Sequence, residues 1–429
     1  MAKPKLALIP AAQGSKLFSV LPSSGVGDFD FTRSGSATRI NSQGLIETVG
    51  NGVSRLNYPM IDGKVVGCPH HILEPQRTNL ITYSEDFSNA YWSKIGSSIT
   101  SNAVISPDGT LNGSKLIENT ATSAHLLYRF VTVPSNVDHT ETLYFKKGER
   151  KYAFISTTGF LVETAIFDIE LGAVSYEGAN IIDAKIEELA NGWFKCQLTT
   201  NTVTTSNAYQ FGASSDGVSI TYTGDGTSGV YIWGAMLEQG SYPTSYIKSN
   251  GSATTRSAET ANGSGDAATF NDSEGVLMAE VSALVNNGES RRISISHSAD
   301  DTSNRITLEV DETTSTIKAF MSSGNVTVGS ITVNNINQTN NNKIALLYKE
   351  NTFEMHINGF LLGSDYTIAS LPIELSRLQL EGANGSNDFY GKTKQVQYYN
   401  SALTESELSQ LTSWTSFTDM AEGQLYTIE

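Results

Sequence analysis

Two pairs of carboxylates alternate along strand-like stretches of the sequence. One residue separates Asp168 from Glu170, and one separates Glu309 from Asp311. Because side chains of a strand alternate between its two faces, each pair points to one side. Two acids aimed into one cleft can carry out glycoside hydrolysis. Both pairs run straight into a turn without a third aligned acid, so we interpret them as solvated strand ends.

Aromatic side chains offer a second kind of site, because sugars stack on ring faces while nearby amides or acids bind their hydroxyls. Tyr231 and Trp233 share one face of an alternating stretch, and Trp193 follows an Asn-Gly turn. We take these three residues as glycan-binding candidates. The same pattern also suits core residues, so both interpretations stay open. Further aromatics in this part of the chain are Trp92, Tyr128, Tyr152 and Tyr209.

Metal ligands are sparse in the sequence. Asp225, Asp300 and Asp301 could hold calcium through carboxylate and carbonyl oxygens, although aspartate in such positions also forms turns. The adjacent His70 and His71 would point in opposite directions in an extended chain and cannot easily share one ion. We therefore predict no cofactor, with calcium as the open alternative.

Short apolar–polar alternations, separated by turns rich in Gly, Asp and Asn, recur along the chain. A period of two marks a half-buried strand, and regular short strands with tight turns predict antiparallel sandwiches. A first set covers residues 126–133, 141–146, 152–156, 164–169, 186–190, 193–199, 209–213 and 229–237. A second set begins at residue 275 and ends with a strand over 394–399.

One helix has a clear start. Thr404 as N-cap and Glu407 three residues later form a capping box, after which Leu408 and Leu411 face inward. Only this stretch carries such a signal, so we expect very little helix.

The composition is that of a globular chain, with 39% hydrophobic and 9% aromatic residues among 429. The formal net charge of -16 disfavours nucleic acid as a partner. No apolar run approaches the length of a membrane span, and Pro10 interrupts the only stretch that looks like a signal peptide. Cys68 and Cys196 cannot build a disulfide framework or a zinc site, so the compartment stays undecided.

Two parts of the chain resemble modules of bacteriophage proteins. Residues 79–258, with Asn79-Leu80 at one end and the stretches 230–238 and 240–246 at the other, resemble a carbohydrate-binding-module-like jelly roll. Residues 266–415 resemble the concanavalin/laminin-G-like sandwiches at the ends of tail and fibre proteins. Residues 416–429 form a C-terminal tail.

The N-terminal part has many turn signals and no continuous apolar pattern. Residues 27–39 and 68–80 resemble N-terminal segments of phage tail proteins, which implies that residues 1–78 attach the protein to the particle. We expect an extended attachment segment whose apolar groups need a second copy or a virion partner. The alternative is that it folds back onto the first sandwich. Residues 250–265 are small and turn-prone, which predicts a linker.

The predicted fold class is all-β: an extended N-terminal attachment segment followed by two antiparallel β-sandwiches. The resemblance implies a bacteriophage virion structural protein, a tail or fibre component with modules for host surface attachment. Expected partners are other virion proteins through residues 1–78, a host surface glycan and further copies of the chain, with a trimer favoured. We expect no enzymatic activity and neither nucleic acid nor membrane as a partner. The alternatives are a head fibre or capsid-decorating protein, a glucanase-like glycan hydrolase and a bacterial surface adhesin.

Overall fold

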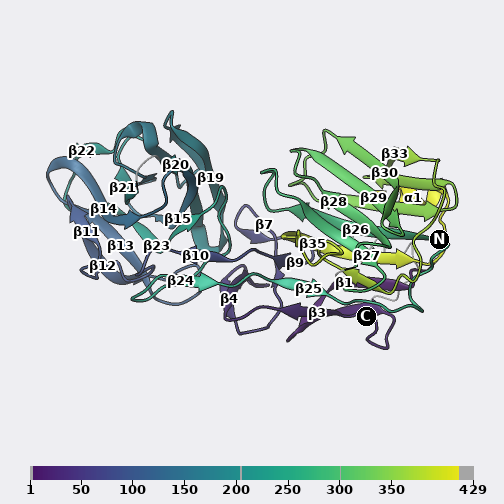
Figure 1. The fold of residues 1–429 in the computed structure, drawn as a ribbon. Coiled ribbons are helices and arrows are strands. Elements are labelled where there is room, and N and C mark those ends of the chain that lie inside the picture. The colour runs from purple at the N-terminus through teal and green to yellow at the C-terminus, as the bar shows by residue number, and fades with distance from the viewer. Residues whose placement is uncertain (1–2, 203–204, 300, 415–429) are drawn as a thin grey trace.

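The computed structural model describes residues 3–202, 205–299 and 301–414. They form two β-sandwich lobes, a blue-to-teal one and a green-to-yellow one (Figure 1). Strands make up 52% of the described residues and helix 4%, so the predicted all-β fold class is confirmed. No helix among the described residues is long and apolar enough to span a membrane. Asp300 and the tail 416–429 lie outside the described residues.

The first sandwich packs two antiparallel sheets face to face. Leu127, Ile155 and Phe211 of one sheet meet Leu143 and Ile232 of the other in a shared core. The first sheet has the order β11 (Ser93–Ile95), β14 (Thr122–Thr132), β21 (Ser206–Ser214), β16 (Tyr152–Ser156), β17 (Thr164–Asp168), β18 (Ala173–Glu177), with β22 (Thr221–Thr223) beside β14. The second has the order β12 (Ser97–Val104), β13 (Gly113–Glu118), β23 (Gly229–Gln239), β15 (Val137–Lys147), β20 (Trp193–Thr202), β19 (Ile181–Glu188). Two single 3-10 turns, η1 (Leu161–Glu163) and η2 (Ala190–Gly192), join strands here.

The second sandwich is built on a larger sheet that crosses the whole lobe. Its order is β25 (Thr260–Asn262), β3 (Phe29–Thr32), β2 (Lys16–Leu21), β1 (Leu6–Gln13), β35 (Gly391–Tyr399), β26 (Glu274–Ala283), β31 (Asn342–Lys349), β32 (Thr352–Ile357), β33 (Phe360–Asp365). Beside β35 lies β9 (His70–Leu73), which also pairs with β6 (Leu56–Asn57). The facing sheet has the order β30 (Val326–Asn334), β29 (Thr316–Ser323), β28 (Arg305–Val310), β27 (Arg291–Ser296), β34 (Arg377–Gln379).

The predicted helix is present as α1 (Glu405–Ser413). Thr404 accepts a hydrogen bond from the Glu407 backbone, and the Glu407 side chain accepts one from the Thr404 backbone. Leu408 and Leu411 are buried against Val276 and other residues on the outside of the large sheet. The capping box therefore sets where the helix begins, and its two leucines fix the face that packs.

The described part of residues 1–78 is built into the lobes, which corrects the prediction of an extended attachment segment. β1 pairs with β35, β2 with β1, and β3 with β2, so the purple N-terminal strands lie under the green-to-yellow lobe (Figure 1). Their apolar side chains enter the core of the second sandwich, namely Leu6, Leu8, Leu17, Phe29 and Phe31. The surface that these groups need is thus supplied by the chain itself.

The middle of the N-terminal segment instead covers the first sandwich. The hairpin of β4 (Ala37–Ile40) and β5 (Ile46–Val49) is followed by a second, of β7 (Met60–Ile61) and β8 (Lys64–Val65). Ile40, Ile46 and Met60 pack on the outer face of the β12–β19 sheet. The alternative prediction, folding back onto the first sandwich, therefore describes this stretch.

The stretch 250–265 is a structured connector, which corrects its prediction as a linker. β24 (Thr254–Arg256) pairs with β10 (Arg77–Asn79), and β25 pairs with β3. Arg256 is 1% exposed and Glu259 0%. The small, turn-prone residues predicted a linker, but this stretch pairs with two strands and buries two charged side chains.

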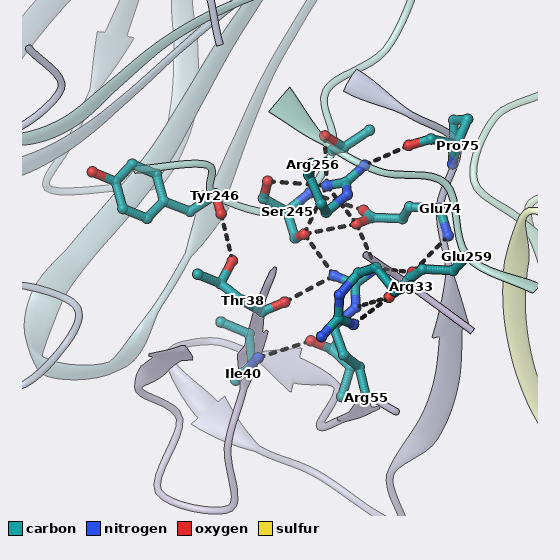
Figure 2. A network of polar contacts seen from close by, with 12 residues as sticks. Arg33, Thr38, Ile40, Arg55, Glu74, Pro75, Ser245, Tyr246, Arg256 and Glu259 are labelled. Carbon is teal, nitrogen blue, oxygen red and sulfur yellow. Dashed lines mark hydrogen bonds and ion pairs between the residues drawn. The ribbon is translucent and has the colours of Figure 1, made fainter. Parts of the chain in front are cut away.

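A buried ionic network fixes this connector (Figure 2). Glu259 binds Arg33 at 2.7 Å and also Arg55, and it accepts the backbone N–H of Glu74 at 3.0 Å. Glu74 binds Arg55 and Arg256, each at 2.8 Å. Burial alone would raise the pKa of Glu74, but the charges of Arg256 and Arg55 hold it below its ordinary value.

The network ties together parts of the chain that are far apart in sequence. The Glu74 carboxylate also accepts the backbone N–H and hydroxyl of Ser245, at the end of the first sandwich. The Arg55 guanidinium donates to the carbonyl of Thr38 at 2.8 Å. Since buried charges are tolerated only when paired and hydrogen-bonded, this cluster holds the N-terminal segment, the first sandwich and the connector in one arrangement.

Candidate functional site

The three sequence-predicted glycan residues come together on the outer face of the β12–β19 sheet. Trp193 and Trp233 lie in one cluster with Tyr144 and Tyr246, and Tyr231 packs at its edge. The Trp233 and Tyr246 rings are 4.4 Å apart, and the Trp193 indole N–H donates to the Ile105 carbonyl at 2.9 Å. They form a core rather than an open platform.

The exposed fractions decide what these residues can do. Trp193 is 0% exposed and Trp233 1%, because both pack in one cluster with Tyr144, Tyr246 and the side chains of the β4–β5 hairpin. Neither ring face is open to a sugar, which corrects both as stacking candidates. Tyr231 remains half-buried beside Lys115, whose ammonium lies 6.0 Å from the ring centroid. Strand alternation placed Tyr231 and Trp233 on one face, but it could not reveal that residues 40–60 cover that face.

An accessible aromatic surface lies on the other sheet of the first sandwich. Tyr128 on β14, Tyr152 on β16 and Tyr176 on β18 are half-buried on its outer side. Phe130 on β14 is 62% exposed, and its ring meets that of Tyr128 at 5.7 Å. We call these four residues, together with Gln210, the tyrosine face.

Strand register explains why these side chains share one side. Tyr128 lies opposite Gln210, and Gln210 lies opposite Ser156 on β16. Tyr176 lies opposite Ile166 on β17. Directly paired residues point to the same face, whereas the alternate residues on these strands face the core of the first sandwich. The tyrosine face is therefore the outer side of the β11–β18 sheet.

The tyrosine face has an apolar floor and polar groups beside it. Leu126, Phe154 and Ile166 are buried beneath the tyrosines. Gln210 is half-buried on the same face and makes no side-chain hydrogen bond among the described residues. The Lys151 ammonium lies 4.8 Å from the Tyr152 ring centroid. Ring faces with a free amide nearby can stack on a sugar and hydrogen-bond its hydroxyls.

The sequence indicated part of this face. Tyr128 and Tyr152 were among the noted aromatics, whereas Phe130, Tyr176 and Gln210 were missed. The alternation of Leu126, Tyr128 and Phe130 within one predicted strand was a usable signal. No such signal marked Tyr176, because the strand over residues 173–177 was not predicted.

The weak calcium candidates have local partners. Asp225 accepts the backbone N–H groups of Thr227 and Ser228 at 2.8 and 2.7 Å, and lies 3.6 Å from Arg150. Asp301 accepts the backbone N–H of Ser303 at 2.7 Å. Within residues 3–202, 205–299 and 301–414, no three His, Cys, Asp or Glu side chains gather as metal ligands would. Cys68 and Cys196 are both free.

The two carboxylate pairs each have a cation beside them. Asp168 lies 3.6 Å from Lys151, and Glu170 also pairs with a lysine. Glu309 binds Arg292 at 2.9 Å and Asp311 binds Lys318 at 2.7 Å. Asp168, Glu309 and Asp311 are buried, so the interpretation as solvated strand ends is wrong for these three acids. Ion pairs account for them instead.

No protein-family model matches the chain, and no curated protein matches it. Similar solved structures are carbohydrate-binding modules, sialidases and laminin G domains. The Ruminococcus gnavus sialidase CBM40 bound to α2,3 sialyllactose is 13% identical over 35% of this chain and 93% of its own, with a TM-score of 0.28. Mouse laminin α1 LG4-5 is 10% identical over 66% and 90%, with a TM-score of 0.22. Trypanosoma rangeli sialidase with sialic acid is 10% identical over 94% and 78%, with a TM-score of 0.28. Such values assign neither ligand nor activity to this chain.

Proposed function

We propose that this protein is a non-catalytic glycan-binding protein whose first sandwich holds sugar on the tyrosine face. The observation that carries the proposal is the group of half-buried rings, Tyr128, Tyr152 and Tyr176, around a buried apolar floor. The rings provide flat apolar area that is already ordered, so stacking costs little conformational entropy. Gln210 supplies both donors and an acceptor for hydroxyls.

The proposed setting is the surface of a bacteriophage particle, with the protein as a tail or fibre component that binds a host glycan. Support comes from the resemblance of residues 27–39 and 68–80 to tail-protein segments. Exposed apolar residues on β2, Phe18 at 37% and Val20 at 45%, offer a contact for another virion protein or a further copy in a trimer. A head fibre is the alternative position, and a map of the intact particle distinguishes the two.

Glycan-array screening of the full chain, followed by titration calorimetry, tests the binding function. The array includes sialyllactose, which was bound to the CBM40 structure. Tyr128→Ala and Tyr152→Ala should each weaken binding about tenfold, the effect of about 1.4 kcal/mol of lost stacking. Tyr366→Ala, at a 56% exposed ring of the second sandwich, is the matched control and should change nothing.

A reducing-sugar assay on the bound glycan tests the non-catalytic part. We expect no release of reducing ends. If reducing ends are released, and Asp168→Asn or Glu309→Gln abolishes that release, the protein is a hydrolase. If both tyrosine variants bind the glycan as the natural chain does, the tyrosine face is not the binding site.

A further inference from the structure

A polar cavity of about 810 Å³ opens where the first sandwich meets the second. Its walls come from β10, from the ends of β14 and β23 and from the start of β15, with Glu289 contributed by the second sandwich. This volume lies within the range of small-molecule sites, which often form at domain junctions. None of its lining residues belongs to the tyrosine face.

Arg77 gives this cavity a donor without an acidic partner. Among the described residues Arg77 forms no ion pair, its Nε is buried without a hydrogen-bond partner, and its only hydrogen bond is a 3.4 Å contact to the Gln76 carbonyl. The guanidinium lies 5.0 Å from the Tyr242 ring centroid. At Gly240, where φ is +137°, a Cβ would come within 2.8 Å of the Arg77 Nη2.

Neighbouring residues hold the Arg77 side chain in position. It lies on β10 opposite Arg256 of β24, and Arg256 is held by Glu74 in the ionic network. Glycine at 240 leaves room for the guanidinium, and Tyr242 provides a flat surface under it. The donor group is therefore ordered before any ligand arrives, which lowers the entropy cost of binding.

Asp138 gives the same cavity an acceptor without a cationic partner. One carboxylate oxygen accepts the Asn201 side-chain amide at 2.7 Å, and no described Lys or Arg pairs with it. Glu289, the lining residue from the second sandwich, is bound by Arg291 at 2.9 Å. The lining thus combines a donor-only guanidinium with acceptor-only carboxylates.

The charges of the lining select among ligand classes. A carboxylate or phosphate would bind Arg77 but would be repelled by Asp138 and Glu289. A cation would bind these two carboxylates but would be repelled by Arg77. A sugar hydroxyl both donates and accepts, so a neutral oligosaccharide can satisfy both groups at once. We propose that this junction cavity is a second binding site, separate from the tyrosine face, and that it takes a neutral oligosaccharide between Arg77 and Asp138.

Titration of the full chain with neutral trisaccharides, and with the same chains ending in a uronic acid, tests the site. Arg77→Met and Asp138→Asn should each weaken neutral-sugar binding at least tenfold while leaving the thermal unfolding temperature unchanged. The uronic acid forms should bind more weakly than the neutral ones. Lys185→Met and Asp183→Asn, which remove an exposed pair elsewhere on the first sandwich, are the matched controls.

Three results would overturn the site: no neutral trisaccharide binding to the full chain, binding that neither cavity variant changes, or binding of the uronic acid chains by the natural protein that is tighter than binding of the neutral ones. The last would mean that the ligand of the cavity is an anion. Loss of binding in Arg77→Met but not in Tyr152→Ala would support the cavity as a binding site and exclude the tyrosine face. Loss of binding in Tyr152→Ala but not in Arg77→Met would support the tyrosine face and exclude the cavity.

Discussion

At the scale of single residues, Glu141 is the side chain most out of keeping with its surroundings. It lies on β15 between Leu198 and Leu237, inside the first sandwich. One carboxyl oxygen accepts the Thr157 hydroxyl at 3.1 Å, and the other has no partner among the described residues. Burial raises the pKa of Glu141 to about 8. The folded chain therefore favours the neutral acid.

This pKa sets the sign of a pH effect on stability. In the unfolded chain the carboxyl titrates near its ordinary value of 4.5, so its stabilising contribution is present below about pH 4.5 and is lost as the pH rises toward 8. The linkage corresponds to about 1.4 kcal/mol per pH unit in that window. Glu141→Gln cannot ionise and should remove this loss.

Urea unfolding from pH 5 to pH 9 measures the difference. The Glu141→Gln variant should gain stability relative to the natural chain as the pH rises, and the gain should level off above pH 8. Glu312→Gln, the same change at an exposed position, is the control and should follow the natural chain. If the free energies of unfolding of Glu141→Gln and the natural chain change with pH in the same way, Glu141 does not have a raised pKa.

At the scale of elements, alternation predicted strands well wherever neighbours in sequence are neighbours in the sheet. The hairpin near residues 349–351 closes with Lys349 opposite Thr352, and the Asn358-Gly359 turn joins Ile357 to Phe360. Local signals suffice there because the turn and both strands lie within a few residues. The partner of β1 could not be predicted, since β35 lies almost 400 residues later and alternation does not specify what packs on a face.

The same limit applies to the candidate site. The sequence placed Tyr231 and Trp233 on one side of β23, which the structure confirms. The bulge that follows Trp233 then turns Met236 to the same side. The sequence could not show that the β4–β5 hairpin packs with Trp233 in one buried cluster. Tyr128 and Tyr152 could be recognised as aromatic, but only the register of β14, β21 and β16 shows that they share an open face.

The connector depends on one residue more than on any other. Glu259 is the acceptor for both Arg33 and Arg55, so Glu259→Gln would leave the buried Arg33 guanidinium without its counter-charge and Arg55 with Glu74 alone. Removing one partner of a buried ion pair costs about 3–5 kcal/mol. We expect that loss in the free energy of unfolding, together with new protease cleavage between residues 250 and 265.

The control for this prediction is Glu170→Gln. Glu170 pairs with Lys147, and both side chains are roughly two-fifths exposed, at 41% and 43%. Such surface pairs contribute about 0–1 kcal/mol, so this variant should stay as stable and as protease-resistant as the natural chain. If Glu259→Gln and Glu170→Gln lose the same free energy of unfolding, burial of the ionic network does not add to stability.

At the scale of the whole molecule, the order of strands in space differs from their order in the chain. The second sandwich uses β1, β2, β3 and β9 from the N-terminal segment, and the first sandwich is inserted between them and β26. The linker prediction implied that residues 266–429 fold alone. The sheet order now implies that they do not, because one side of β35 would lose its partners β1 and β9.

Expression of residues 266–429 alone tests this point. The fragment lacks Leu6, Leu8, Leu17, Phe29 and Phe31, five members of the second core, and it exposes a long apolar strand edge of the kind that aggregates. We expect it to be insoluble, or soluble without a cooperative thermal transition.

A chain in which a short Gly-Asn turn replaces residues 34–258 is the control that separates missing strands from a merely poor boundary. Thr32 lies directly opposite Thr260 in an antiparallel pair, so such a turn can close β3 onto β25 as a hairpin. The closed chain regains β1, β2 and β3 and should unfold cooperatively. If residues 266–429 alone unfold with the same transition as the closed chain, the N-terminal strands add nothing to the second sandwich. Their pairing with β35 would then be a surface contact rather than part of its core.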